Sequence, residues 1–405
     1  MIWSISWKNI WRSKVRSTVV ITAIALGLTA GIFSSAFFTG MVNQRINQAI
    51  SNEISHIQIH NPDFKETTEL SSYIPGANRI YNKIKTNPDV LGVSKRIIIY
   101  SMAASAETAS GVKITGIDPA DESMVSGISS KMIDGKYFEG VKRNPVVIGK
   151  KLAEKLKIKA RSKIVITLQD MDKNITGGAF RVAGIYETAN TGFDENNIYV
   201  RDTDLARLIN LPDDVCHEIA ILVNDNEISM LVDEEMKKQF PDLEVLNWKE
   251  ISPEMSYMTE MMDLYNYIFI VIILFALLFG IINTMLMVVL ERRKELGMLL
   301  AIGMSKGRVF AMIMLETVLL SLTGGAVGIL MGWAVSAYFG TTPINLSRWA
   351  EGYSQLGYDT IVYTSIEPAQ FVVIAVMVIF TGIIAALYPA YKALKYEPAE
   401  ALRIE

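Results

Sequence analysis

The sequence contains a single cysteine, which excludes any disulfide bond within the chain. A folded domain built by this chain must therefore rely on its own hydrophobic core. Cys216 lies just before a short apolar run, Ala220–Val223. We interpret it as a small buried side chain beside a strand.

Signatures of catalysis and of metal binding are also missing. The sequence has no H-E-x-x-H and no G-x-S-x-G motif. His56 and His60 are four residues apart, which in a strand separates them by about 13 Å. That is too far to share a metal ion bound at about 2 Å from each nitrogen. We interpret both as surface or cross-strand residues, and we predict no catalytic residue and no metal site.

A phosphate-binding motif of the form G-x-x-x-x-G-K-[ST] is absent as well. Gly135-Lys136 and Gly149-Lys150 supply the final dipeptide, but neither has the upstream glycine or the following Ser or Thr. We therefore expect no cofactor in this chain. If the protein performs ATP-driven work, a partner chain must bind the ATP and its Mg.

Charge is sparse, at 20% of the residues, and the formal net charge is −3. No basic tract is interleaved with aromatic residues, so the sequence gives no reason to expect a nucleic-acid partner. Half of the residues are apolar and the mean hydropathy is positive. This composition indicates a membrane protein.

Four charge-poor runs are long enough to cross a bilayer, which takes roughly 20 helical residues. Backbone polar groups inside the bilayer must be paired within their own segment, so we predict that each run is a helix. The third run contains one acidic residue, Glu316, which should face the helix bundle or lie near the cytoplasmic boundary. The predicted spans are residues 18–40, 264–290, 309–340 and 369–391.

The distribution of Lys and Arg predicts the orientation of these spans. Basic residues cluster before the first span, in the loop 291–308 and in the tail 392–405, which places both termini and that loop in the cytoplasm. The long segment 41–263 and the short loop 341–368 then lie on the outer side. The basic residues that decide this are Lys8, Arg12, Lys14, Arg16, Arg292, Arg293, Lys294, Lys306, Arg308, Lys392, Lys395 and Arg403.

Residues 1–17 form a separate element before the first span. Trp3, Trp7 and Trp11 recur at helical spacing, which predicts an amphipathic elbow helix lying on membrane lipid. A cleaved signal peptide is the alternative. However, the charge-free stretch 17–44 is much longer than a signal core of roughly 7–15 residues.

The segment between the first two spans indicates a large α+β domain of two lobes. Short strand patterns, such as the alternation of apolar and polar residues over 54–60, are interrupted by helical patterns. We predict a βαβ-rich lobe from about 41–123 plus 213–250, and an inserted β-rich lobe at about 124–212. Ser252-Pro253 begins a stalk helix, 252–263, that leads into the second span.

Two features of the membrane part point to contacts between helices or with a partner. Gly324, Gly328 and Gly332 form a ladder that predicts close helix packing in the third span. The loop ERRKELGMLLAIGMSKGR, 291–308, consists of helix formers at its start, and Gly303 and Gly307 bracket a turn back to the membrane. It is either an ordinary basic loop or a short helix that docks into a partner.

This loop, the following LETVLLSLTGGAVGILMG and the C-terminal YPAYKALKYEPAEALR resemble the signature of the FtsX/MacB/LolC-LolE class of ABC-transporter permeases. The resemblance implies a four-span subunit of the bacterial inner (cytoplasmic) membrane with a large periplasmic domain. It also implies a second permease subunit, either the same chain or a paralogue, and separate ATPase subunits of the LolD or MacB type.

By the same resemblance, 291–308 is the coupling helix through which ATP-driven closure of the ATPase moves the stalk and the external lobes. The residues that the resemblance assigns to ATPase coupling are Glu291, Arg292, Arg293, Glu295, Leu296, Gly297 and Gly303.

Within the class, SWKNIWRSKVRST, EISHIQIHNPDF, GIDPADE and NPVVIGKKLAEKLKI most resemble the LolC/LolE type. That type extracts lipoproteins from the inner membrane and passes them to a periplasmic carrier. Two alternatives remain open: a MacB-like efflux permease for antibiotics or peptides, and an FtsX-like regulator of a cell-wall hydrolase. For lipoprotein release, acyl chains would enter between the first span of one subunit and the second span of the other. The expected lining residues are Ile21, Phe33, Phe37, Tyr267, Ile270 and Leu274.

Overall fold

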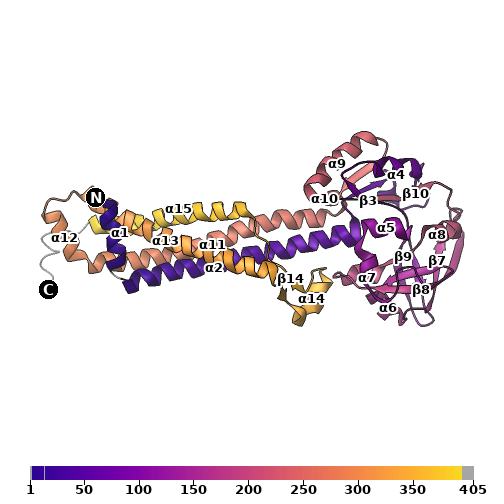
Figure 1. Ribbon diagram of the computed structural model, residues 1–405, viewed down its shortest axis with the longest axis horizontal. Helices are drawn as coiled ribbons and strands as arrows, with labels where there is room; N and C mark the ends of the chain where they lie inside the picture. The colour runs from indigo at the N-terminus through magenta and orange to yellow at the C-terminus, as the bar shows by residue number, and fades with distance from the viewer. Residues whose placement is uncertain (1, 13, 395–405) are drawn as a thin grey trace. The chain divides into compact units, whose positions relative to one another are not determined.

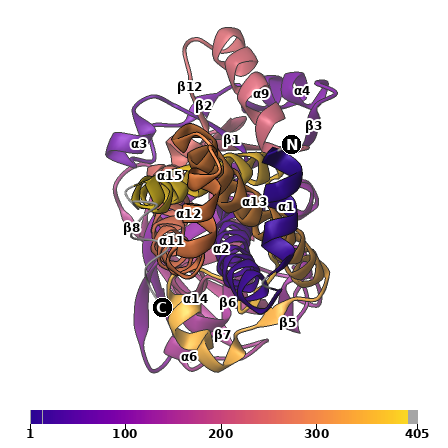
Figure 2. The same cartoon turned by 90° about the vertical axis from the view of Figure 1, so that its left-hand side faces the viewer.

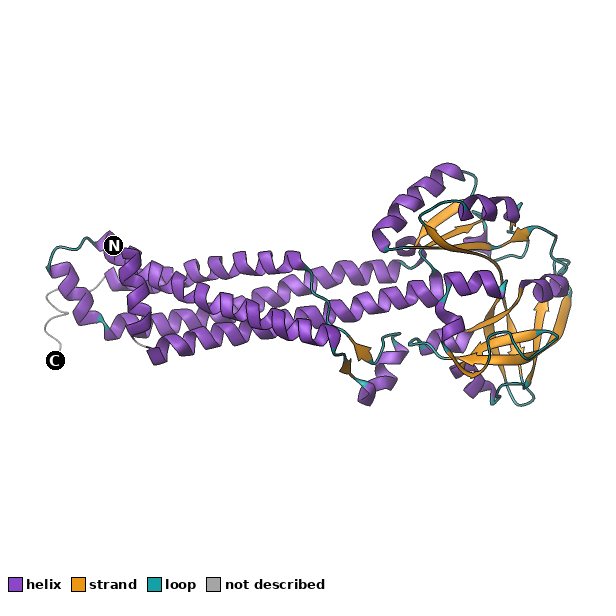
Figure 3. Cartoon of the chain, viewed as in Figure 1, coloured by secondary structure: helices purple, strands orange, loops and turns teal. Residues whose placement is uncertain are grey.

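A computed structural model describes residues 2–12 and 14–394. These residues divide into two compact units. The helical unit comprises the chain up to Met41, Thr259–Ile344 and the chain from Val362, and the α/β unit comprises Val42–Met258 and Asn345–Ile361. Figure 3 shows helices in purple and strands in orange.

The helical unit contains four helices that are long and apolar enough to cross a membrane, which confirms the predicted number of spans. They run side by side in Figures 1 and 2. Each extends beyond the predicted apolar run because its ends continue into polar helical sequence. The helices of this unit are α1 (Ile2–Arg12), α2 (Lys14–Ala49), α11 (Pro253–Glu291), α12 (Arg293–Ala301), α13 (Lys306–Thr341) and α15 (Pro368–Leu394).

The glycine ladder of α13 lies against α2. A Cβ atom added to Gly324 or Gly332 would lie 2.9 Å from a Cβ atom of α2, that of Ile24 or Ile32 respectively. At Gly328 it would lie 3.0 Å from the Cα atom of Ala25. Only glycine therefore allows the two backbones to approach this closely.

The α/β unit is built on one long sheet. Its strand order is β12-β1-β11-β3-β4-β9-β6-β8-β5, and β7 pairs with β3 and β8. Neighbours are antiparallel except for β4 with β9 and β6 with β8. The strands are β1 (Ile57–His60), β3 (Val90–Ala104), β4 (Ala109–Ile117), β5 (Met132–Gly135), β6 (Pro145–Gly149), β7 (Lys163–Gln169), β8 (Ile175–Tyr186), β9 (Asn197–Arg201), β11 (Glu218–Val223) and β12 (Glu244–Asn247).

Short helices and two-residue strands complete this unit. The π-helical segment Ile50–Ile54 continues the end of α2, and β2 (Ile74–Pro75) pairs with β10 (Val215–Cys216). The helices are α3 (Phe64–Thr67), α4 (Ala77–Lys85), α5 (Pro119–Val125), α6 (Lys150–Leu156), α7 (Thr191–Asn196), α8 (Asp202–Ile209), α9 (Asn226–Gln239), α10 (Trp248–Ile251) and α14 (Ala350–Gln355).

The division of this unit into lobes differs from the prediction. One core contains Ile57, Val93 and Ile219, and a second contains Ile97, Ile114 and Val146. Ile97 and Ile99 of β3, and Ile114 of β4, therefore pack in the second core, whereas the prediction assigns them to the first lobe. Ile117, at the end of β4, packs in a further core with Tyr199. The reason is that β3 runs through both cores, pairing with β11 at its start and with β4 and β7 further on. Alternation indicates a strand but not its neighbours.

The histidines are not surface residues, which corrects part of their interpretation. His56 and His60 are both buried because β1 lies between β11 and β12, and all four residues of β1 are buried. His60 bonds through its ring nitrogens to the His217 carbonyl oxygen, at 3.1 Å, and to Gln58. Cys216 is buried in β10. Among the described residues, no group of three or more His, Cys, Asp or Glu could hold a metal ion.

The loop between the third and fourth spans has structure of its own. It contains α14 and the paired two-residue strands β13 (Ile344–Asn345) and β14 (Ile361–Val362). Its residues 345–361 belong to the α/β unit. The predicted tail 392–405, which includes most of the C-terminal family signature, lies outside the described residues from 395 onward.

Candidate functional site

The coupling segment folds as the nine-residue helix α12 between α11 and α13. It lies at the same end of the helical unit as α1 (Figure 1). Gly303, with φ of +99°, adopts the left-handed conformation that ends many helices, and the Met304 N–H then donates to the Leu299 carbonyl oxygen at 3.0 Å. The sharp turn lets α13 begin at Lys306.

One face of α12 is buried in the helical unit. Leu296 is 2% exposed and belongs to the same core as Val309 and Met312 of α13. Gly297 beside it is also buried. These two predicted coupling residues therefore fix the helix within its own subunit.

Three charged residues at the start of this segment, Glu291, Arg292 and Glu295, pair with residues of neighbouring helices. Glu295 contacts Arg12 of α1 at 2.9 Å and Arg292 at 3.0 Å. Arg292 in turn lies 3.1 Å from both carboxylate oxygens of Glu316 on α13. Glu291, at the end of α11, pairs with Arg16 of α2. Glu316 thus faces the bundle, as its charge requires.

The neighbouring arginines stabilise the ionised form of Glu295. Partial burial disfavours the ionised Glu295, but hydrogen bonds and charge from Arg292, together with the charge of Arg12, outweigh it and hold the Glu295 pKa below its ordinary value. Glu295 is therefore a carboxylate at neutral pH.

The opposite face of α12 is exposed and partly apolar. Lys294 and Met298 are four residues apart, which places them on one side of the helix, and Ile302, the residue after the helix end, follows at the same spacing. Met298 is 50% exposed and Ile302 is 78% exposed. An apolar stripe facing away from the bundle is typical of a helix that docks into a partner groove.

The predicted cleft lies between two subunits, so its residues need not meet within one chain. Ile270 and Leu274 are buried in the helical core, whereas Tyr267 is half exposed. Phe33 packs its ring 5.5 Å from that of Phe339. A groove of about 570 Å³ does lie between α2 and α11, but its walls are Val19, Val20, Ala23, Ile24, Gly27, Ala30, Ser34, Phe269, Ile273, Ala276, Leu277, Gly280, Ile281 and Thr284.

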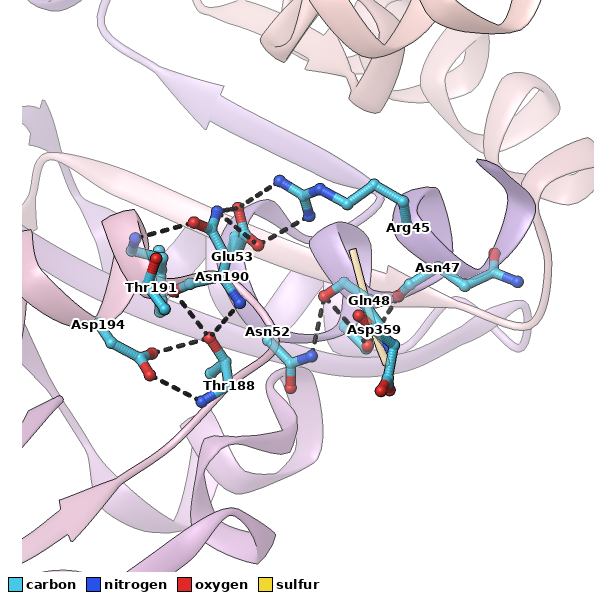
Figure 4. Close-up of polar contacts among 12 residues, drawn as sticks. Arg45, Asn47, Gln48, Asn52, Glu53, Thr188, Asn190, Thr191, Asp194 and Asp359 are labelled. Atoms are coloured by element: carbon cyan, nitrogen blue, oxygen red, sulfur yellow. Dashed lines mark hydrogen bonds and ion pairs between the residues drawn. The ribbon is translucent and has the colours of Figure 1, made fainter. Parts of the chain in front are cut away.

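Sequence reasoning missed a polar junction in the α/β unit, which Figure 4 shows. We use this name for Arg45, Glu53 and Asn190 with the residues that they hold together. Arg45 donates to both carboxylate oxygens of Glu53, at 2.8 and 3.3 Å, and the Asn190 amide donates to the same carboxylate. The junction joins the segment after the first span to the start of α7.

The junction also holds the segment 345–361. Gln48 donates to Asp359 at 2.8 Å, and the Thr191 hydroxyl donates to the Ser354 carbonyl oxygen at 3.1 Å. Gly357, with φ of +77°, lies directly over the Arg45 guanidinium, where a Cβ atom would be 2.6 Å from its Nε. No linear sequence motif connects these three segments, so only the fold brings them together.

Asp194 of α7 is the buried acid next to this junction. It is 1% exposed and accepts hydrogen bonds from the backbone N–H and the hydroxyl of Thr188, at 2.9 and 2.7 Å. Burial raises its pKa to about 7, helped by the nearby charges of Glu187 and Glu53 and opposed by the Thr188 bonds.

Two protein-family models together match most of the chain. The family model for the FtsX-like permease C-terminal region matches residues 267–398, which include α12 and the glycine ladder. The model for the MacB-like periplasmic core domain matches residues 17–239, more than half of the chain. This chain belongs to the FtsX/MacB/LolC class of ABC-transporter permeases.

Relatives of this permease are similar at low identity. An uncharacterized ABC transporter permease of Methanocaldococcus jannaschii is 27% identical over 67% of the chain, and the match covers 65% of that protein, just under two thirds. The lipoprotein-releasing system transmembrane protein LolC of Haemophilus influenzae is 23% identical over 77% of the chain and 78% of its own length. The macrolide export ATP-binding/permease protein MacB of Chlorobaculum tepidum is 32% identical over 31% of the chain and 17% of its own length.

Membership of this class confirms the resemblance found in the sequence. The predicted architecture of four membrane helices with a large external-type domain is confirmed as well. The class implies an ABC ATPase as the partner of this permease and fits an inner-membrane location. The assignment of individual coupling residues is not decided by the family match. The structure adds that most of the charged ones are paired within the subunit.

Proposed function

We propose that this permease is the membrane subunit of an ABC transporter that extracts lipoproteins from the inner membrane and hands them to a periplasmic carrier. In this proposal a separate ATPase, holding the ATP and Mg, supplies the energy. The observation that carries the coupling part is α12, which is packed into the bundle on one face and apolar on its exposed face.

The docking surface for the ATPase is the face of Lys294, Met298 and Ile302. Burying Met298 and Ile302 in a partner groove would remove apolar area from water, which favours association by about 25 cal/mol per Å². Force applied there reaches α11 and α13 through the short connections at both ends of α12.

The orientation follows from the basic residues. Arg12, Arg16 and the α12 segment lie at one end of the helical unit, and positive charge marks the cytoplasmic side of membrane proteins. Both termini are therefore cytoplasmic in this proposal, and the α/β unit is periplasmic.

Lipoprotein cargo is supported by the similarity to LolC over most of the chain and by an apolar groove in the membrane region. Each CH₂ group of an acyl chain adds about 0.8 kcal/mol to the cost of leaving the bilayer, so extraction needs an energy source such as ATP. A second permease subunit, identical or paralogous, would complete the cleft that receives the chains.

Export of antibiotics or peptides is the second candidate, because the MacB-like core model covers most of the α/β unit. Regulation of a cell-wall hydrolase, as the FtsX name suggests, would use the same coupling without transport.

The test is purification of the tagged full chain from its native membrane in mild detergent, with mass spectrometry of the proteins that accompany it. An ATPase with triacylated lipoproteins is the expected result. An ATPase accompanied by a periplasmic adaptor or a hydrolase would overturn lipoprotein release but keep coupling. Absence of any ATPase, under conditions that keep other transporters whole, would overturn both.

A further inference from the structure

The charged residues of the coupling segment form a chain of ion pairs that begins in solvent and ends in the bundle. Arg12 is 68% exposed in its side chain, Glu295 37%, Arg292 20% and Glu316 8%. Each member contacts the next at 2.9 to 3.1 Å. The chain links three helices, because Arg12 lies on α1, Glu295 on α12 and Glu316 on α13.

The buried end of this chain fixes its geometry. A carboxylate at 8% exposure near the membrane is costly unless a cation neutralises it, so Glu316 requires Arg292 beside it. Arg292 is the residue immediately before α12, and this requirement therefore fixes the start of the helix. Glu295, one turn later, then meets both Arg292 and Arg12.

We propose that Arg12 and Glu316 are positioning residues for α12, and that Arg292 and Glu295 serve as an internal brace and not as contacts to the ATPase. This inference rests on the proposed coupling function. The brace holds α12 to α1 and α13, so a push on the outer face of α12 moves all three helices together. Without it, α12 would shift alone on its two short connections.

The pairing itself supplies a test, because an internal ion pair is restored when both of its charges are exchanged. The variants are Arg12→Glu, Glu295→Arg and the double exchange, made in the full chain and purified from the native membrane. Arg12 is mostly exposed, so its reversal leaves folding intact. The matched control exchanges Lys136 and Glu139, an exposed pair of the α/β unit at 3.2 Å.

Two quantities are measured on each variant: hydrogen exchange of the amides in 293–301, and ATP hydrolysis by the ATPase that copurifies. Each single reversal should speed exchange about three- to fivefold, as expected for loss of an exposed pair. The ATPase should still copurify, but its rate of ATP hydrolysis should change. The double exchange should be closer to the unaltered chain than Glu295→Arg in both quantities, because position 295 regains an oppositely charged partner at position 12 while it still faces Arg292. The control exchange should change neither.

Two results would overturn the brace. One is a double exchange as impaired as Glu295→Arg alone. The other is loss of the ATPase from Glu295→Arg with unchanged exchange in 293–301, which would place Glu295 in the ATPase interface. If no ATPase accompanies even the unaltered chain, the proposed function fails, while hydrogen exchange still decides the brace.

Discussion

In each of the two units, buried charged side chains are paired with other polar side chains. Glu53 lies between Arg45 and Asn190, and Arg96 lies between Glu122 and Glu218, at 2.7 and 2.6 Å. Removing one partner of such a set leaves an uncompensated charge, which costs more than the intact pair contributes. Single substitutions at these positions should therefore have large effects.

The single substitution Arg45→Gln tests the polar junction. The substitution leaves Glu53, whose side chain is 12% exposed, with only the Asn190 amide, so the α/β unit should lose about 2–4 kcal/mol of stability. The measurement is the thermal melting temperature of the full chain together with protease cleavage within 345–361. Lys151→Gln breaks an exposed pair and should change neither. Equal melting temperatures for both variants would argue against the junction.

Asp194 should make stability depend on pH. Its pKa is raised in the folded chain to about 7, from about 4 in the unfolded chain, so the folded state holds the proton more tightly between these values. Its contribution is therefore fully present below about pH 4 and is lost as the pH rises through about 7. The melting temperature of the unaltered chain, minus that of Asp194→Asn, should fall over this range. A constant difference would show that Asp194 ionises normally.

At the scale of elements, the contact between α2 and α13 depends on the glycine ladder. Gly328→Ala places a Cβ atom within 3.0 Å of the Ala25 backbone, which forces α13 away from α2 and should cost about 1–3 kcal/mol. Gly280→Ala on α11 meets nothing within 4 Å and is the matched control, expected to be neutral or slightly stabilising. Melting temperatures in detergent compare the two. A Gly328→Ala chain as stable as the control would contradict close packing.

Elements were predictable from sequence where one local pattern determines them. The four spans follow from length and hydropathy, and the start of α11 follows from Ser252-Pro253. The partners of β3 were not predictable, because alternation carries no information about neighbours. Nor was the burial of His60, since a short strand paired on both sides is covered whatever its pattern.

The candidate site was likewise predictable from the sequence only in part. The motif located α12, but it did not reveal that Glu295 turns toward Arg12, almost 300 residues earlier in the chain. The polar junction depends on three distant segments and left no linear signal. Contacts of this kind arise from the fold, so a sequence motif finds the element and the structure finds its partners.

At the scale of the whole molecule, the chain passes between the helical unit and the α/β unit four times, because 345–361 joins the α/β unit as well as 42–258. The α/β unit is thus attached through α2, α11 and both ends of the 345–361 segment. A displacement of the membrane helices therefore has four covalent routes into it.

In the proposed function, ATP hydrolysis by a partner drives release of lipoproteins through this permease. The most direct measurement reconstitutes the purified complex with a triacylated lipoprotein in liposomes and follows the lipoprotein that becomes soluble when ATP and a periplasmic carrier are added. ATP-dependent release is expected, and Met298→Asp should abolish it by removing the docking surface. ATP hydrolysis that proceeds while the lipoprotein stays in the membrane would contradict the proposed function.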